Sequence, residues 1–123
     1  MAVTQTVAIL GASPDPSKFA FRAMKKLQEH GHKVILVNPE HEEILGQPVL
    51  PSLSQIREPV ETLTLYVGPQ RLEALVHDIL DLRPQRVLFN PGTESPALIN
   101  ALKGAHIHFA RGCTLLLLDS GKF

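Results

Sequence analysis

The sequence predicts an α/β fold, a single doubly wound, mostly parallel sheet of about five strands with helices on both faces. Five short apolar runs, enriched in β-branched residues, lack the polar alternation of half-exposed strands, which indicates burial on both faces. Helical patterns follow most of these runs, and a parallel neighbour is reached through such a crossover. The expected strands are Thr6 to Leu10, Lys33 to Val37, Leu63 to Val67, Arg86 to Phe89 and Ile107 to Ala110.

Three helices are expected from apolar residues at three-four spacing, bounded by recognisable start and stop residues. Gly31 supplies a left-handed residue after the first helix, and Pro84 follows the end of the second. Ser95 is the expected N-cap of the third, with Pro96 at its first helical position. The expected helices cover Lys18 to His30, Gln70 to Leu82 and Ser95 to Gly104.

Composition narrows the classes of function. A chain of 123 residues with 44% hydrophobic residues can bury one core and is too short for two ordinary domains, so residues 1–123 are expected to form one domain. Twelve Lys and Arg balance twelve Asp and Glu, which disfavours a nucleic-acid or membrane-surface partner and favours a small-molecule ligand or a protein partner of unknown identity. Without a leader pattern or a bilayer-length apolar run, and with Cys113 as the lone cysteine, a cytoplasmic location is expected.

In doubly wound sheets, ligands bind outside the carboxyl ends of the strands. Small and turn-forming residues are typical of ordinary turns, so no single strand end here indicates a site. Their agreement at five strand ends predicts one: Gly11-Ala12-Ser13, Asn38-Pro39, Tyr66-Val67-Gly68-Pro69, Asn90-Pro91-Gly92-Thr93 and Arg111-Gly112-Cys113.

The loop after the first strand disfavours two common nucleotide sites. A dinucleotide fingerprint needs three spaced glycines and an acidic residue after the second strand, whereas this loop has Gly11 alone and the second strand ends at Asn38. A P-loop would need a second glycine followed by Lys-Ser or Lys-Thr. A phosphate at the start of the following helix fits the sequence, with a hydroxyl from Ser13 and positive charge from Lys18 and Arg22.

The motifs carry a family resemblance. In the succession GASPDPSKFAFRAMKKLQEHGHKVILVNPEHEEILGQPVLPSL, then TLYVGP, FNPGTES and GCTLLLL, the chain resembles the small stand-alone coenzyme A-binding domain proteins. These resemble the amino-terminal Rossmann-like domain of the succinyl-coenzyme A synthetase α subunit. The similarity runs from about Thr6 to the carboxyl terminus and implies coenzyme A, or a related adenine nucleotide, across the carboxyl edge of the sheet.

The resemblance also implies a role for each loop. It places the pyrophosphate at Gly11, Ala12 and Ser13, the adenosine beside Asn38 and Pro39, and the pantetheine arm along Tyr66, Val67, Gly68, Pro91, Gly92 and Thr93. One position departs from the pattern, because many relatives have a basic residue directly after Asn-Pro and this chain has Glu40. Either Lys18, Arg22 or Lys33 compensates for that carboxylate, or coenzyme A binds weakly, or the ligand differs.

Candidate reactive residues leave alternatives open. Cys113, at a strand end near a helix start, is either inert or able to form a mixed disulfide with a pantetheine thiol, and is counted with the ligand-binding residues. His106 and His108 alternate along an expected strand, but no metal site is expected from them or from the four histidines that flank turns or lie on a helix: His30, His32, His41 and His77.

No catalytic residue is expected, and the resemblance implies that the synthetases' catalytic histidine belongs to a second domain that 123 residues do not accommodate. The main hypothesis is non-catalytic binding of coenzyme A or an acyl-coenzyme A, as a sensor, carrier or buffer. The alternative is a small enzyme that acts on an acyl or nucleotide substrate with Cys113 or the Thr93-Glu94 loop, and an NAD-dependent oxidoreductase is disfavoured by the missing glycines.

Overall fold

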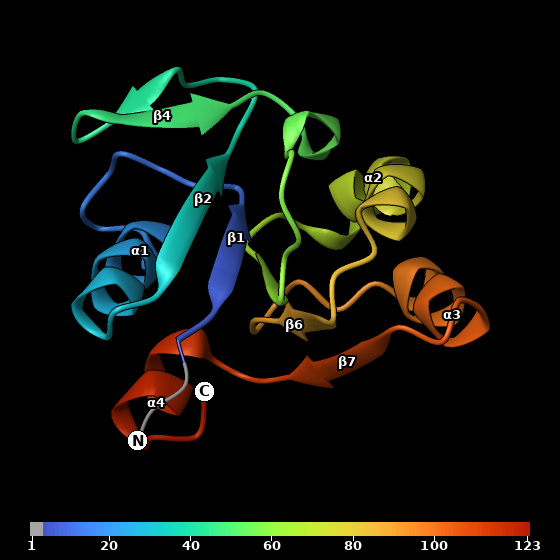
Figure 1. The fold of residues 1–123 in the computed structure, drawn as a ribbon. Coiled ribbons are helices and arrows are strands. Elements are labelled where there is room, and N and C mark those ends of the chain that lie inside the picture. Colours follow the sequence, from blue (N-terminus) through green and yellow to red (C-terminus); the bar gives the residue numbers. More distant parts are fainter. Residues whose placement is uncertain (1–3) are drawn as a thin grey trace.

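The computed structural model describes residues 4–123, which form a seven-stranded sheet between two helical layers (Figure 1). The strand order is β3-β4-β2-β1-β5-β6-β7, and every pair is parallel except β3 with β4. The winding reverses between β1 and β5, which places the expected ligand crevice at the carboxyl ends of these two strands. The strands are β1 (Thr6–Leu10), β2 (Lys33–Val37), β3 (Glu43–Ile44), β4 (Gln47–Leu50), β5 (Thr62–Leu65), β6 (Arg86–Phe89) and β7 (His108–Arg111).

The helices are divided between the two faces of the sheet. They are α1 (Phe19–Glu29), α2 (Pro69–Leu82), α3 (Pro96–Gly104) and α4 (Thr114–Asp119), with a short 3₁₀ turn at Leu53–Gln55. Figure 1 shows α1 and α4 on one side and α2 and α3 on the other. Alternate residues of β1 enter the two cores, Val7 and Ile9 toward α1 and α4, Ala8 and Leu10 toward α2 and α3. This two-sided burial explains why β1 reads as a continuous apolar run.

The predicted α/β class is confirmed, and the sheet has seven strands where about five were expected. The two additional strands, β3 and β4, form a hairpin that no sequence pattern predicted. Its two turn residues, Leu45 and Gly46, both have positive φ, at +51° and +76°. Such a turn matches the twist of two-residue hairpins, and Asn-Gly or Asp-Gly is its usual signal. Pro48 within β4 also reads as a strand breaker, although it is tolerated in so short a pairing.

The expected helix boundaries agree with the structure to within a residue or two. Gly31 has φ of +84°, and its N–H and that of His32 return to carbonyls in the last turn of α1, as in a glycine-terminated helix. Ser95 caps α3 by accepting a hydrogen bond from the Leu98 N–H at 3.2 Å. The α2 helix ends at Leu82, and Arg83 adopts the left-handed conformation directly before Pro84.

The carboxyl-terminal part of the chain differs more from the expectation. The apolar run Leu115 to Leu118 belongs to the short α4, where Leu118 is buried and Leu116 is exposed. The last strand starts at His108 because His106 turns the chain with φ of +58°, so the expectation that the two histidines share a strand face is wrong. Within residues 4–123, no helix combines the length and apolarity that crossing a bilayer requires.

Candidate ligand-binding site

Two cavities open at the carboxyl edge of the sheet, one on each side of the end of β5. The first encloses about 210 Å³ against α2, and the second about 170 Å³ against the start of α1. Val67 lines the first and Tyr66 lines the second. Neighbouring residues of an extended segment point to opposite faces, so these two consecutive side chains divide the edge into two compartments.

The first cavity is largely apolar. Its apolar walls come from the ends of β1 and β2, the segment after β4, and α2: they include Val37, Pro39, Pro51, Leu53, Val67 and Leu75. Three polar residues, Asn38, Ser52 and Arg71, also border it. Its volume lies below the roughly 300–1,000 Å³ of sites that enclose a whole drug-sized ligand, so it suits one ring system with a few polar contacts.

Gly11 and Ala12 are held by the strand next to them. The N–H groups of both residues donate to the carbonyl of Val37, at 2.9 and 3.2 Å. These two amides therefore have an acceptor within the protein, and the expectation that they bind a pyrophosphate has no free donor behind it. The Ser13 N–H is the member of this loop triplet that has no acceptor among residues 4–123.

Gly11 must be glycine for a reason that lies within the protein. Its φ is +94°, and a Cβ at this position would lie 2.8 Å from the carbonyl oxygen of Tyr66 and 2.9 Å from Cγ1 of Val67. The end of β1 thus packs directly against the end of β5. The absence of a side chain at Gly11 lets the two strand ends approach each other, whereas the expected reason was the approach of a phosphate.

The rest of the loop before α1 is organised by its own side chains. The hydroxyl of Ser13 accepts the Asp15 N–H at 3.1 Å, and Asp15 accepts the N–H and the hydroxyl of Ser17 at 2.9 and 2.8 Å. These bonds from Ser17 stabilise the carboxylate and lower the pKa of Asp15. The helix begins only at Phe19, so the expected helix-start phosphate site does not directly follow Gly11.

Asn38 joins the two loops that border the first cavity. Its Nδ2 donates to the carbonyl of Ala12 at 2.8 Å, and its Oδ1 accepts the N–H of Glu40 at 2.8 Å. The side chain is half-buried, whereas Pro39 and Glu40 are exposed. Asn38 therefore sets the position of the turn that carries Glu40, which follows the cavity-lining Pro39 and does not itself line the cavity.

The second cavity is bordered by Phe19, Tyr66, Asn90, Pro91 and Cys113. The Tyr66 hydroxyl is buried and has no hydrogen-bond partner in the described part of the chain. Burial raises the pKa of Tyr66 to about 12, which keeps the phenol neutral and able to donate. Cys113 is half-buried at the N-cap of α4, so this cavity has a free thiol on its wall, while the Tyr66 hydroxyl lies in the protein interior beside Thr64 and Thr114.

A buried polar network supports the second cavity, and sequence analysis missed it. Asn90 donates to the Thr64 hydroxyl at 2.6 Å and to the Leu65 carbonyl at 2.9 Å, and it accepts from the N–H and hydroxyl of Thr114 at 2.9 and 3.0 Å. These bonds connect β5, β6 and the start of α4. Thr64 and Thr114 gave no signal in sequence because their partner lies on a different element.

The loop after Asn90 uses its own polar groups internally. Thr93 is buried and donates its hydroxyl to the Asn90 carbonyl at 2.7 Å, while Glu94 accepts the Gly92 N–H at 2.9 Å. Neither Thr93 nor Glu94 lines either of the two cavities described above. Gly68 and Gly92 are exposed at the same edge, with open space where a side chain would stand.

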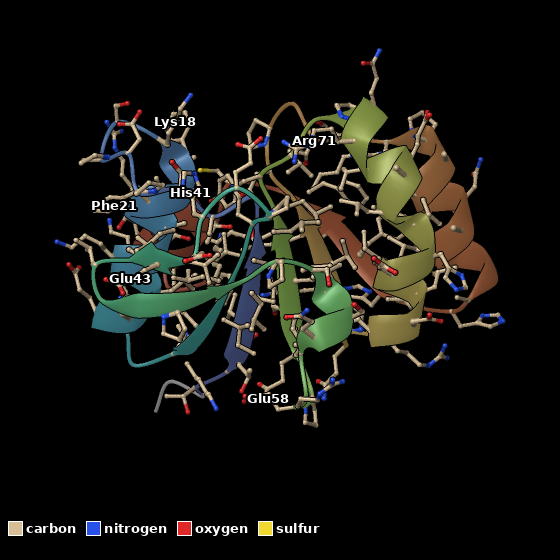
Figure 2. The ribbon with its side chains drawn as sticks, turned by 90° about the horizontal axis from the view of Figure 1, so that it is seen from above. Lys18, Phe21, His41, Glu43, Glu58 and Arg71 are labelled. Atoms are coloured by element: carbon tan, nitrogen blue, oxygen red, sulfur yellow. The ribbon has the colours of Figure 1, made fainter. Side chains whose placement is uncertain are left out.

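Three basic residues are candidates for the charge that meets a bound phosphate: Lys18 directly before α1, Arg22 on α1 and Arg71 on α2. Figure 2 shows Lys18 and Arg71 at one edge of the sheet and Glu58 at the opposite edge. Arg22, on α1, lies with its guanidinium 5.6 Å from the ring of Phe19. Lys33 cannot compensate for Glu40, contrary to expectation, because it begins β2 at the far edge and pairs with Glu58 at 2.6 Å.

The histidines do not gather. No group of three or more His, Cys, Asp or Glu residues within residues 4–123 is arranged to hold a metal ion. His32 instead accepts the Gln5 N–H at 2.9 Å, and burial lowers its pKa. His77 lies exposed on α2 beside Asp81, at 3.3 Å.

Comparison with known proteins places the chain in a family. A family model described as "CoA binding domain" matches residues 5–119. The chain belongs to this family of CoA-binding domains. The same relationship was indicated by the order of the sequence motifs.

The CoA-binding domain is similar to a segment of acetate–CoA ligase [ADP-forming] I of Archaeoglobus fulgidus, with 41% identity over 68 residues. That segment covers 55% of this chain and 10% of the ligase. This chain is also 26% identical over 78 residues to the uncharacterized protein YneT of Bacillus subtilis, an alignment that covers 63% of this chain and 58% of YneT. A solved structure of an uncharacterized protein superposes with a TM-score of 0.92 and 38% identity, over 98% of this chain and 99% of that one.

Proposed function

We propose that this CoA-binding domain binds coenzyme A or an acyl-coenzyme A across the carboxyl edge of the sheet, without turnover of its own. The adenine ring occupies the first cavity, the pyrophosphate crosses the ends of β1 and β5, and the pantetheine arm enters the second cavity. The observation that carries this proposal is the pair of cavities on opposite sides of Tyr66 and Val67. An elongated ligand with a ring at one end fits two separate compartments better than one.

The chemistry of each compartment supports this orientation. The first has largely apolar walls and the size of one ring system, as an adenine requires. The second is bordered by the rings of Phe19 and Tyr66 and by Pro91, apolar surfaces along which the arm can lie, and by the Cys113 thiol. This chain also aligns with a segment of the Archaeoglobus fulgidus ligase, and the name of that ligase includes CoA.

Binding without turnover is favoured by how the polar side chains of the site are used. The Thr93 hydroxyl and the Glu94 carboxylate are engaged in hydrogen bonds within their loop. The sensor, carrier and buffer roles share this binding step. The second candidate is an enzyme that uses Cys113, and one observation favours it: the thiol borders the cavity assigned to the arm.

Calorimetry with coenzyme A, acetyl-coenzyme A and NAD tests the binding proposal. We expect coenzyme A to bind more tightly than NAD, because one glycine and the uncharged Asn38 do not make a dinucleotide site. Tighter binding of NAD, or no binding of coenzyme A at millimolar concentration, would contradict it. Incubation with acetyl-coenzyme A tests the enzyme candidate. Repeated release of free coenzyme A that is lost in Cys113→Ser would show that the chain is an enzyme and not only a binding protein.

A blocking substitution tests the position of the base. Ala74 is exposed on α2 and borders the first cavity, so Ala74→Phe is expected to fill it and weaken coenzyme A binding at least tenfold while the fold remains. Ala97→Phe, an equal change at an exposed position of α3 that borders neither cavity, is the matched control. Equal affinities in the two variants would place the base elsewhere.

A further inference from the structure

Arg71 is a basic side chain at the first cavity that lacks an acidic partner. It is exposed in the first turn of α2, and within residues 4–123 it forms no ion pair and no side-chain hydrogen bond. Three other cations are engaged: Lys26 pairs with Asp119, Lys33 pairs with Glu58, and Arg86 donates twice to the Thr62 hydroxyl. Arg71 therefore offers its guanidinium at the mouth of a largely apolar cavity.

The start of α2 adds to this positive field. The first intrahelical bond runs from the Leu72 N–H to the Gly68 carbonyl, so the N–H groups of Gln70 and Arg71 have no acceptor within the helix. No acidic residue lies in this first turn, and Pro69 occupies its first position. Unpaired amides at the start of a fourteen-residue helix favour an anion at the same place as the guanidinium.

The position of Arg71 distinguishes between the phosphates of the proposed ligand. A pyrophosphate links the adenosine to the pantetheine arm, so it must run from the first cavity toward the second, past Tyr66 and Val67. Arg71 borders the first cavity and not the second. A phosphate that branches from the ribose does not lie on the path to the second cavity, and it can remain beside α2.

We propose that Arg71 binds a phosphate monoester carried on the ribose of the nucleotide whose base occupies the first cavity. This inference rests on the proposed function and adds a specificity-determining residue to it. A guanidinium can present two parallel N–H donors to a phosphate, a geometry that an ammonium group lacks. Arg71 thereby supplies, from α2, the positive charge that Glu40 does not supply from the turn after Asn38 and Pro39.

The experiment compares ligands that differ by the ribose phosphate alone. Coenzyme A and 3′-dephospho-coenzyme A are titrated calorimetrically into the unmodified chain, Arg71→Gln and Arg57→Gln. Arg57 is exposed at the opposite edge, near Glu58, so its replacement removes the same charge and is the matched control. Circular dichroism and thermal unfolding confirm that all three proteins are folded.

We expect Arg71→Gln to weaken coenzyme A binding about tenfold and 3′-dephospho-coenzyme A binding less than twofold, with the first effect shrinking as salt is added. Arg57→Gln is expected to change neither affinity. Adenosine 3′,5′-bisphosphate and adenosine 5′-monophosphate repeat the comparison without the pantetheine arm, and the same difference is expected.

An equal loss for both coenzymes would place Arg71 at the pyrophosphate and overturn the assignment, and unchanged affinities would overturn any phosphate contact. Either result leaves the proposed function standing, because the unmodified chain still binds. Failure of the unmodified chain to bind coenzyme A would instead overturn the proposed function and this inference together.

Discussion

Replacement of Gly11 by alanine tests the claim that this glycine serves the junction of β1 and β5. Two penalties act on the variant. A side chain at φ of +94° costs about 1–3 kcal/mol in backbone strain. A Cβ placed 2.8 Å from the Tyr66 carbonyl and 2.9 Å from Val67 adds about 1–3 kcal/mol of overpacking, because the nearest atom belongs to the backbone of a central strand segment. Gly11→Ala is therefore expected to lose about 2–6 kcal/mol of unfolding free energy.

Gly92→Ala is the matched control for this variant. Its φ is +87°, close to that of Gly11, but no atom lies within 4 Å of the position where a Cβ would be built. It should therefore lose only the strain, about 1–3 kcal/mol. Urea unfolding followed by circular dichroism measures both free energies, and thermal unfolding should place Gly11→Ala several degrees below Gly92→Ala.

The two variants also separate stability from ligand contact. Gly11 lines the first cavity, but its amide and that of Ala12 already donate to Val37, and an added Cβ would point at Tyr66 and Val67. Gly11→Ala should therefore bind coenzyme A nearly as the parent does wherever it remains folded. Equal losses of stability in the two variants would refute the close approach to Tyr66. An unchanged stability with lost binding would restore the original interpretation, in which the glycine makes room for a phosphate.

Two more predictions concern Glu40, in the turn next to the first cavity, and Tyr66, which lines the second. Glu40→Lys is expected to strengthen coenzyme A binding about tenfold at low salt, roughly 1–2 kcal/mol, since it replaces repulsion by attraction beside a phosphate; unchanged affinity would mean that Glu40 faces solvent alone. Because the folded pKa of Tyr66 is raised from 10.0 to about 12, its contribution to stability is complete below about pH 10 and is lost as the pH rises toward 12. Tyr66→Phe should remove that alkaline loss in urea unfolding across this range, and a variant with the parent's pH profile would show that another group causes it.

Sequence patterns were sufficient for the elements whose signals are local. The bounds of β1, β2 and β6 were predicted to the residue, because each strand is a short apolar run that can be read directly from the sequence. The caps at Gly31 and Ser95 likewise depend on residues within one turn of the helix. The order of the motifs along the sequence also indicated the family.

Partners distant along the chain escaped prediction. The network of Thr64, Asn90 and Thr114 joins three elements, and each member alone reads as a strand or turn residue. In the sequence, Arg71 is one of many cations expected at the surface. In the folded chain, it lies at a cavity between the end of β2 and the start of α2. The hairpin of β3 and β4 was missed because its turn, Leu45-Gly46, lacks the usual residue types.

The sequence by itself determined the class of the fold, the edge of the sheet at which a ligand is expected, and the absence of a glycine-rich dinucleotide loop. Only the tertiary structure shows that Gly11 packs against Tyr66 and that the amides of Gly11 and Ala12 donate to Val37. It also shows that Arg71 is the cation that lines the first cavity. The physical reason is the range of the interactions. Periodicity and capping depend on neighbours along the chain, whereas a contact such as Gly11 with Tyr66 exists only after β1 and β5 have paired.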